Sequence, residues 1–211
     1  MDWNDVFQWS QKGFIACCAL VVQLTLSLAL GQQSRDAKHA VYDKPLTPEQ
    51  LTVYRSLLVI WFQGEKASIN LAVETEPIPA QGDPVHKECL NGLSLEAIAT
   101  GQVHRIRAED AAQLSPIEIH LVDPEVQGKE VSKYDPGKAI REGKPVDYAV
   151  RNGFAHGLLT LSEIRFDKSH THALVSFSFV CGRLCGNGNT MLLEQRGGVW
   201  TKKAQCGGWV S

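Results

Sequence analysis

The segment from Leu161 to Ser211 divides into strands and turns more clearly than any other part of the chain. Apolar and alternating runs predict strands at residues 158–166, 171–181, 189–195 and 199–210. Polar or glycine-rich links separate these runs at residues 167–169, 182–188 and 196–198. Because short links join successive strands, we predict an antiparallel meander of at least four strands in the C-terminal half of the chain.

A helix is predicted upstream of this meander. Thr47 can cap its first turn, Pro48 suits the first helical position, and Gln50 completes a capping box. Up to about Gly64, apolar residues recur at spacings of three and four: Leu51, Tyr54, Leu57, Leu58, Trp61 and Phe62. One broad face of this helix should pack against the sheet, which gives an α+β fold.

The middle of the chain has weaker patterns. We predict a strand at 68–75, helical turns at 90–100 and 109–114, a strand at 117–122, and a short helix that Asp123 caps and Pro124 opens. Residues 132–152 contain Pro136, Gly137, Gly143 and Pro145. They are expected to form an irregular excursion with at most one short helix.

An apolar segment lies near the N-terminus. Residues 14–30 are uncharged, and the segment ends in Ala29-Leu30-Gly31, with small residues at the −3 and −1 positions of a cleavage site after Gly31. We expect residues 1–31 to be a signal peptide; the alternatives are a retained membrane anchor and a buried core helix. Residues 32–46 would then be a linker and residues 47–211 a single α+β domain, exported to the periplasm, the cell envelope or the medium.

Cysteine use agrees with export. Four cysteines follow the predicted signal peptide: Cys89, Cys181, Cys185 and Cys206. An even number of cysteines in an oxidising compartment is typical of disulfides, here two with three possible connectivities. A zinc site is disfavoured because the single C-x3-C lacks a second short pair.

Strand geometry ranks the connectivities. If the hairpins turn at Cys185 and at Gly197-Gly198, Asn189 lies opposite both Cys181 and Cys206. These two cysteines would then be two strands apart, about 9.5 Å, beyond the roughly 7 Å that a disulfide bridges. We favour the pairs 181–185 and 89–206, with 185–206 and 89–181 as the alternative.

The C-terminal segment also contains the sequences Ala173-Leu174-Val175, Cys-Gly-Arg-Leu-Cys-Gly-Asn-Gly at 181–188, Gly198-Val199-Trp200 and Trp209-Val210-Ser211. This order is similar to the C-terminal signature of a group of uncharacterised exported bacterial proteins. The resemblance covers about a third of the exported chain and implies a shared fold and export. It implies no activity.

No motif predicts catalysis, a metal site or a cofactor. Gly182, Gly186 and Gly188 are interpreted as turn glycines, because no helix follows them to complete a phosphate loop. His170 and His172 lack a third ligand, and Glu74 and Glu76 lie at a strand end, where solvation is usual. Lysine and arginine are scattered and nearly balanced by acidic residues, so nucleic-acid binding is not expected. Membrane contact is expected only if residues 14–30 are kept as an anchor.

Two functional hypotheses follow. The leading one is a non-enzymatic exported binding or structural protein of unknown ligand, with a candidate binding surface at Trp200, Trp209, Arg183 and Leu184. The alternative is a cell-envelope hydrolase whose site forms only in the fold. Such a site would bring Glu74 or Glu163 together with one of four histidines: His120, His156, His170 or His172.

Overall fold

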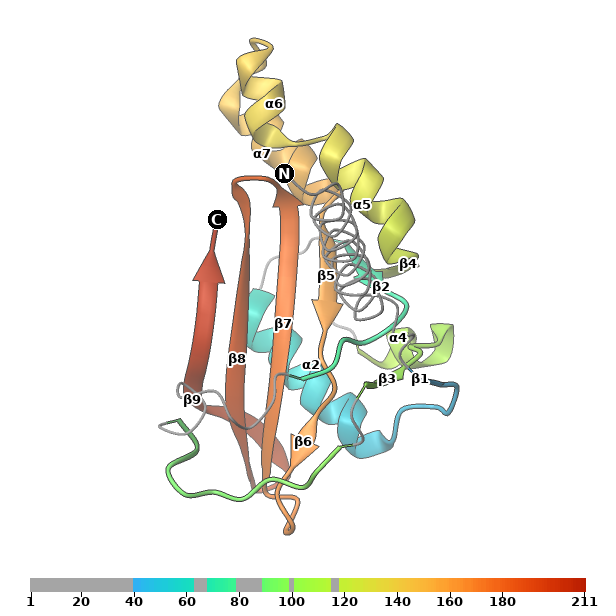
Figure 1. Cartoon of the computed structure of the whole chain (residues 1–211), viewed down its shortest axis with the longest axis vertical. Helices are drawn as coiled ribbons and strands as arrows, with labels where there is room; N and C mark the ends of the chain where they lie inside the picture. The colour runs from blue at the N-terminus through green and yellow to red at the C-terminus, as the bar shows by residue number, and fades with distance from the viewer. Residues whose placement is uncertain (1–39, 63–67, 79–88, 99–100, 115–117) are drawn as a thin grey trace, which may run out of the picture. The chain divides into compact units, whose positions relative to one another are not determined.

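A mixed β-sheet with the strand order β4-β2-β5-β7-β8-β9 organises the structure (Figure 1). The computed structural model describes residues 40–62, 68–78, 89–98, 101–114 and 118–211, so the predicted signal peptide lies outside the described residues. The strands are β2 (Ile69–Ala72), β4 (Ile119–Val122), β5 (Leu158–Leu161), β7 (His172–Gly182), β8 (Cys185–Arg196) and β9 (Val199–Val210), and the short β6 (Arg165–Phe166) pairs with β7. The α+β class predicted from the sequence is confirmed.

The predicted antiparallel meander is confirmed in the part of the sheet from β5 to β9. The rest of the sheet is parallel. β2 pairs in parallel with β4 on one side, and on the other it meets β5 at Leu71 and Leu159. The chain segments between these strands contain helices, which provide the long crossovers that parallel pairing requires.

The helix α2 (Pro48–Phe62) covers one face of the sheet. Its predicted capping box is present, because the Thr47 N–H donates to Gln50 Oε1 (2.9 Å) and the Gln50 N–H donates to Thr47 Oγ1 (3.2 Å). The residues of α2 that are buried in the core are Leu51, Val53, Tyr54, Leu57 and Leu58. Figure 1 shows α2 crossing behind the strands, so the opposite face of the sheet is turned toward the viewer.

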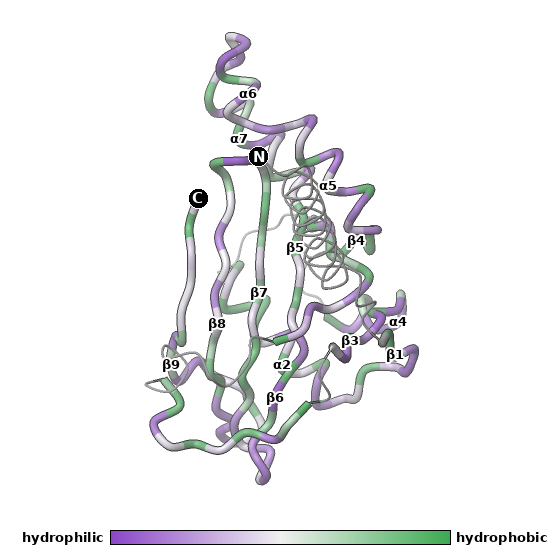
Figure 2. The backbone as a smooth tube through the Cα atoms, viewed as in Figure 1, coloured by the Kyte–Doolittle hydropathy of each residue, from purple (hydrophilic) through white to green (hydrophobic). Residues whose placement is uncertain are grey.

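Residues 132–152 differ from the prediction. Instead of an irregular excursion they hold the end of α5 (Pro124–Lys133), the whole of α6 (Pro136–Arg141) and much of α7 (Val146–Ala155). The prolines begin helices instead of breaking them, because an aspartate caps each of two starts: Asp123 before Pro124 and Asp135 before Pro136. Hydrophilic residues predominate along α5 (Figure 2).

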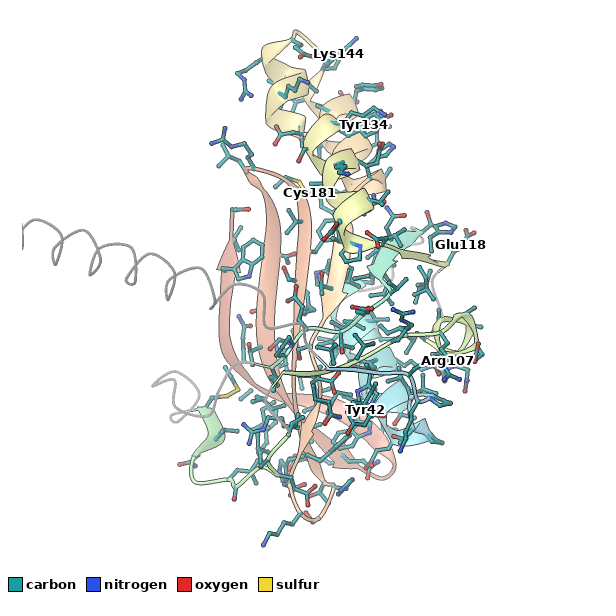
Figure 3. All side chains as sticks on the ribbon, turned by 45° about the vertical axis from the view of Figure 1, so that its right-hand side comes forward. Tyr42, Arg107, Glu118, Tyr134, Lys144 and Cys181 are labelled. Atoms are coloured by element: carbon teal, nitrogen blue, oxygen red, sulfur yellow. A yellow bond between two sulfur atoms is a disulfide. The ribbon has the colours of Figure 1, made fainter. Side chains whose placement is uncertain are left out.

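These helices are fixed to one end of the sheet. The Asp135 carboxylate accepts the Lys138 N–H within α6 (2.7 Å) and the Arg183 N–H in the β7–β8 turn (2.6 Å). Figure 3 shows Cys181 at this end of the sheet, and Lys144 at the tip of the helices. In α7, a Cβ at Gly153 would overlap the Pro136 ring and lie only 3.2 Å from the Cys181 carbonyl oxygen.

The predicted helix at 90–100 is not formed over residues 91–98, which follow a helical turn at Cys89-Leu90. The predicted helix at 109–114 appears as α4 (Ala108–Gln113). Ala40–Tyr42, inside the predicted linker, forms β1 and pairs in parallel with β3 (Gln102–His104). No helix among the described residues is long and apolar enough to cross a membrane.

The favoured disulfide connectivity is confirmed: Cys181 joins Cys185, and Cys89 joins Cys206. The predicted register was wrong, because β7–β8 turns tightly at Arg183-Leu184 and β9 carries bulges against β8. Asn189 therefore lies opposite Phe177 and Gly208, not opposite the cysteines. The Cys89–Cys206 disulfide holds residues 89–95 against the face of the sheet that α2 leaves open, where Leu90 and Leu95 pack on Leu174 and Leu192.

Candidate functional site

The face of the sheet opposite α2 carries a cleft of about 430 Å³, which we call the open-face cleft. Hydroxyl side chains from three neighbouring strand segments line it: Thr160, Ser162, Ser176, Ser178 and Thr190. They share one face because they alternate along the strands with core residues such as Leu159, Leu161, Phe177 and Phe179. The volume is in the range of small-molecule sites.

The hydroxyl groups form two rows across the sheet. In one row Thr160 lies opposite Ser178, and Ser178 opposite Gly188. In the next row Ser176 lies opposite Thr190, and their hydroxyl oxygens are 2.8 Å apart. Ser162 ends this second row, where its Oγ accepts the Ser176 N–H (2.8 Å) and donates to the Glu163 carbonyl (2.7 Å).

Trp209 forms one wall of the cleft. It lies opposite Gly188 in the β8–β9 pair, and its indole covers Gly186 and Gly188, where a Cβ would meet the ring. Trp209 is nevertheless 44% exposed. One face of the ring thus rests on the glycines of β8, and the other face is open to the cleft. Gly186 and Gly188 were predicted as turn glycines; they lie within β8 and make room for this ring.

Glu76 lies at the other side of the cleft, where its backbone forms an isolated parallel β-bridge with Ser162. Its side chain is exposed at the rim, but the surrounding protein removes the carboxyl group partly from water, which raises its pKa. Among the described residues, no side chain donates a hydrogen bond to this carboxylate. Glu76 is also the one ionisable group among the described residues that line the cleft.

A second polar cluster lies inside the fold. The Glu163 side chain is 3% exposed and accepts the hydroxyl of Thr75 and the N–H of His104 (2.8 Å), and its second oxygen lies 2.8 Å from His104 Nδ1. Nearby, the Tyr54 hydroxyl donates to the Ser162 carbonyl (2.8 Å). Burial, followed by the charge of Glu163, raises the pKa of Tyr54 well above its ordinary value.

The acidic groups proposed for a hydrolase do not meet the proposed histidines. Glu163 pairs with His104, which the sequence did not single out, because β3 is only three residues long and has no distinguishing pattern. Glu74 pairs with Arg105 (2.8 Å). His104 could have been found only from the fold, which places β3 beside the segment that follows β2.

The four proposed histidines lie apart from these carboxylates. His120 lies 3.7 Å from Glu118, and His156 stacks on Tyr134 with ring centroids 3.6 Å apart. His170 Nδ1 lies 2.7 Å from Glu49, and His172 lies between Asp167 and Glu194. The described residues contain no cluster of three or more side chains suited to hold a metal ion.

The predicted binding surface is divided by the structure. Trp200 is only 3% exposed and belongs to the core, so it is not part of any surface; its Nε1 has no hydrogen-bond partner among the described residues. Trp209 and the turn residues Arg183 and Leu184 are exposed. Leu184 projects at the turn with 82% of its surface accessible, outside the open-face cleft.

An apolar groove of about 1150 Å³ lies on the other face, where α2 and α7 meet the end of the sheet. Trp61, Phe154 and Phe179 contribute aromatic rings to it. It differs from the open-face cleft in that its aromatic side chains pack on one another, instead of standing beside a row of hydroxyl groups.

Comparisons of the chain with protein-family models, with curated proteins and with solved structures find no match.

Proposed function

We propose that the protein is an exported, non-enzymatic binding protein that holds a small polar ligand in the open-face cleft. The observation that carries the proposal is the Trp209 ring, which rests on Gly186 and Gly188 and leaves one face open beside a row of hydroxyl groups. A half-exposed tryptophan beside polar side chains combines apolar contact with directional hydrogen bonds, as small-molecule sites do.

A binding screen tests this proposal. Polar small molecules are screened by ligand-observed NMR against the wild-type protein, Trp209→Ala and the control variant Leu184→Ala. Leu184 is an exposed apolar residue outside the cleft. Compounds that bind the wild type and Leu184→Ala but not Trp209→Ala would support the proposal. The proposal would be rejected if no compound binds, or if a folded Trp209→Ala protein still binds the compounds.

Export is proposed from the disulfides and from the resemblance to exported bacterial proteins. Disulfides persist in oxidising compartments and are rare in the cytosol. The test is the intact mass of the protein recovered from its native host, with and without reduction. A chain that starts at Gln32, with thiols that can be alkylated only after reduction, would support export with cleavage. A full-length chain found in the membrane fraction would instead support the anchor.

A hydrolase is the second candidate, and the buried Glu163–His104 pair favours it. A carboxylate that holds His Nδ1 orients the ring so that Nε2 can act as a base. The test is hydrolysis of chromogenic esters and glycosides by the wild type, His104→Gln and the control His120→Gln. Turnover lost only in His104→Gln would support a hydrolase, and the absence of turnover by the wild type would reject it.

A further inference from the structure

We propose that the open-face cleft selects an oligosaccharide that carries a free amino group, that is, an oligomer of amino sugars. This inference rests on the proposed binding function and specifies the ligand class of the same cleft. Four features of the described residues lead to it: the charge of the lining, its hydroxyl groups, its width and its aromatic wall.

The charge of the lining disfavours anions. Glu76 is the ionisable group of the described lining, which includes no lysine, arginine or histidine. The Glu76 carboxylate is partly withdrawn from water and accepts no side-chain hydrogen bond from the described residues. An ammonium group of a ligand would offset the cost of that partial desolvation. A ligand carboxylate or phosphate would instead meet like charge, with no cation among the described lining residues to balance it.

The hydroxyl groups suit a hydroxylated ligand. Thr160 and Ser178 lie opposite each other in the row that leads to Trp209, and their side chains make no hydrogen bond within the described structure. Each hydroxyl can donate one hydrogen bond and accept two. Sugar hydroxyls have the same double capacity, so both partners can be satisfied whichever way the ligand's hydroxyl hydrogens point.

A ligand that contacts both Glu76 and Trp209 must have more than one ring. From Glu76 the sheet passes through Ser162, then β7 and β8, before it reaches Trp209 on β9. Four strand spacings of about 4.8 Å place the two backbones up to ~19 Å apart. Even after the side chains reach inward, a single sugar ring cannot touch both ends, whereas a short oligomer can.

The aromatic wall completes the match. A pyranose ring presents C–H groups on one face and hydroxyls around its rim. The open face of Trp209 can pack against those C–H groups, while Ser178 and Thr160, one and two strands beyond Gly188, reach the hydroxyls. The amino group of a later ring then lies near Glu76.

Isothermal titration calorimetry with three defined trisaccharides at about pH 6 and again at about pH 7 tests the inference, because the raised pKa of Glu76 and the titration of the ligand's amino groups make both charges depend on pH. The probes are a glucosamine trimer (cationic), an N-acetylglucosamine trimer (neutral) and a galacturonic acid trimer (anionic). We expect the wild type to bind the glucosamine trimer at least about 10-fold more tightly than the neutral trimer. No binding of the anionic trimer is expected.

Variants separate the contributions. Glu76→Gln should abolish the preference for the cationic trimer, and Trp209→Ala should weaken both trimers. Glu74→Gln is the matched control, because Glu74 lies two residues away but pairs with Arg105 and does not line the cleft; it should keep the preference.

The outcomes distinguish this inference from the proposed function. Equal binding of the cationic and neutral trimers in the wild type would overturn the role of Glu76 but leave ligand binding at Trp209 intact. If no trimer binds but other polar compounds bind through Trp209, only the assignment of the ligand as a sugar would be overturned. Failure of every compound would overturn the binding function and this inference together.

Discussion

Asp167 stabilises the turn between β6 and β7 with both oxygens of its carboxylate. Oδ1 accepts the N–H groups of Thr171 (2.8 Å) and His172 (2.9 Å), and Oδ2 accepts the Ser169 hydroxyl (2.6 Å). Burial alone would raise the pKa of Asp167, but the hydrogen bonds from Ser169, His172 and Thr171 outweigh it and hold the pKa far below its ordinary value. The charged form of this residue is therefore part of the fold.

We predict that Asp167→Asn lowers the free energy of unfolding by about 1–3 kcal/mol at neutral pH, because hydrogen bonds to a charged acceptor are replaced by weaker ones. The folded-state pKa is depressed, so this stabilisation is present above the unfolded pKa of about 3.9 and is lost as pH falls through the folded pKa. Urea unfolding measured from neutral to acidic pH tests this. Asp147→Asn, which removes only an exposed pair with Arg151, is the control. A deficit that does not shrink in acid would contradict the prediction.

His170 adds a second pH dependence with the opposite sign. The hydrogen bond that His170 Nδ1–H donates to the Glu49 carboxylate, at the start of α2, raises the pKa of His170. Its stabilisation is therefore complete below the unfolded pKa of about 6.5 and is lost as pH rises through the folded pKa. In an NMR titration, Glu49→Gln should lower the pKa of His170, whereas the control Glu118→Gln, which removes only the exposed neighbour of His120, should not. An unchanged His170 titration would show that Glu49 is not its partner in solution.

Residue-level prediction from the sequence succeeded where the cause was local. The Thr47–Gln50 capping box and the Asp123 cap depend on neighbours within three residues, and both are present. His104 and Glu163 are 59 residues apart and meet only because β3 lies beside the segment after β2. No local pattern carries that information.

At the scale of elements, β8 and β9 form the wall of the open-face cleft. The two strands differ in composition: β8 contributes glycines at 186 and 188, and β9 contributes the indole that covers them. The sequence interpretation of these glycines was wrong because a glycine in a turn and a glycine under a ring have the same local signature. Likewise, the Asp-Pro start of α6 was interpreted as part of a loop, although the same arrangement was recognised at Asp123-Pro124.

We predict that Gly188→Ala displaces the indole of Trp209, because the added Cβ would overlap Trp209 Nε1. The Cβ would also lie 3.0 Å from the Phe177 carbonyl oxygen, so the strands must adjust slightly at this point. The indole N–H cross-peak of Trp209, assigned with Trp209→Phe, should shift, and ligand binding in the cleft should weaken. Gly128→Ala in α5 is the control, because nothing lies within 4 Å of its added Cβ. It should leave the cross-peak in place. An unmoved Trp209 cross-peak in Gly188→Ala would contradict the described packing.

At the scale of the whole molecule, the disulfides link different lengths of chain. Cys181 and Cys185 are four residues apart, whereas Cys89 and Cys206 are 117 apart and join the middle of the chain to the edge strand β9. In the chain-entropy account, a longer closed loop restricts the unfolded state more strongly. The two disulfides should therefore contribute unequally to stability.

We predict that the double variant Cys89→Ser/Cys206→Ser lowers the free energy of unfolding by about 3–5 kcal/mol, and Cys181→Ser/Cys185→Ser by about 2 kcal/mol. Urea unfolding of both double variants under oxidising conditions measures the difference. Equal losses, or a larger loss for the short loop, would contradict the loop-length argument.

The two halves of the sheet were unequally predictable. From β5 onward each strand pairs with a neighbour along the chain, so turn residues and alternation were sufficient to predict the meander. β2 and β4 are separated by a long segment that contains α4, and their parallel pairing has no turn signal. The disulfide pairing was predicted correctly even though the register was wrong, because Cys181 and Cys206 lie on strands separated by β8 in either register.

The position of α2 near the start of the fold affects when the nascent chain can fold. The ribosome completes α2 and β2 long before residues 158–211, which supply most of the sheet that covers Leu57, Leu58 and Tyr54. Until the last strands are synthesised, the apolar face of this helix lacks most of the sheet that it packs against. The nascent chain must therefore stay unfolded or be sheltered by a chaperone, and loss of its C-terminal strands would leave an aggregation-prone fragment instead of a smaller domain.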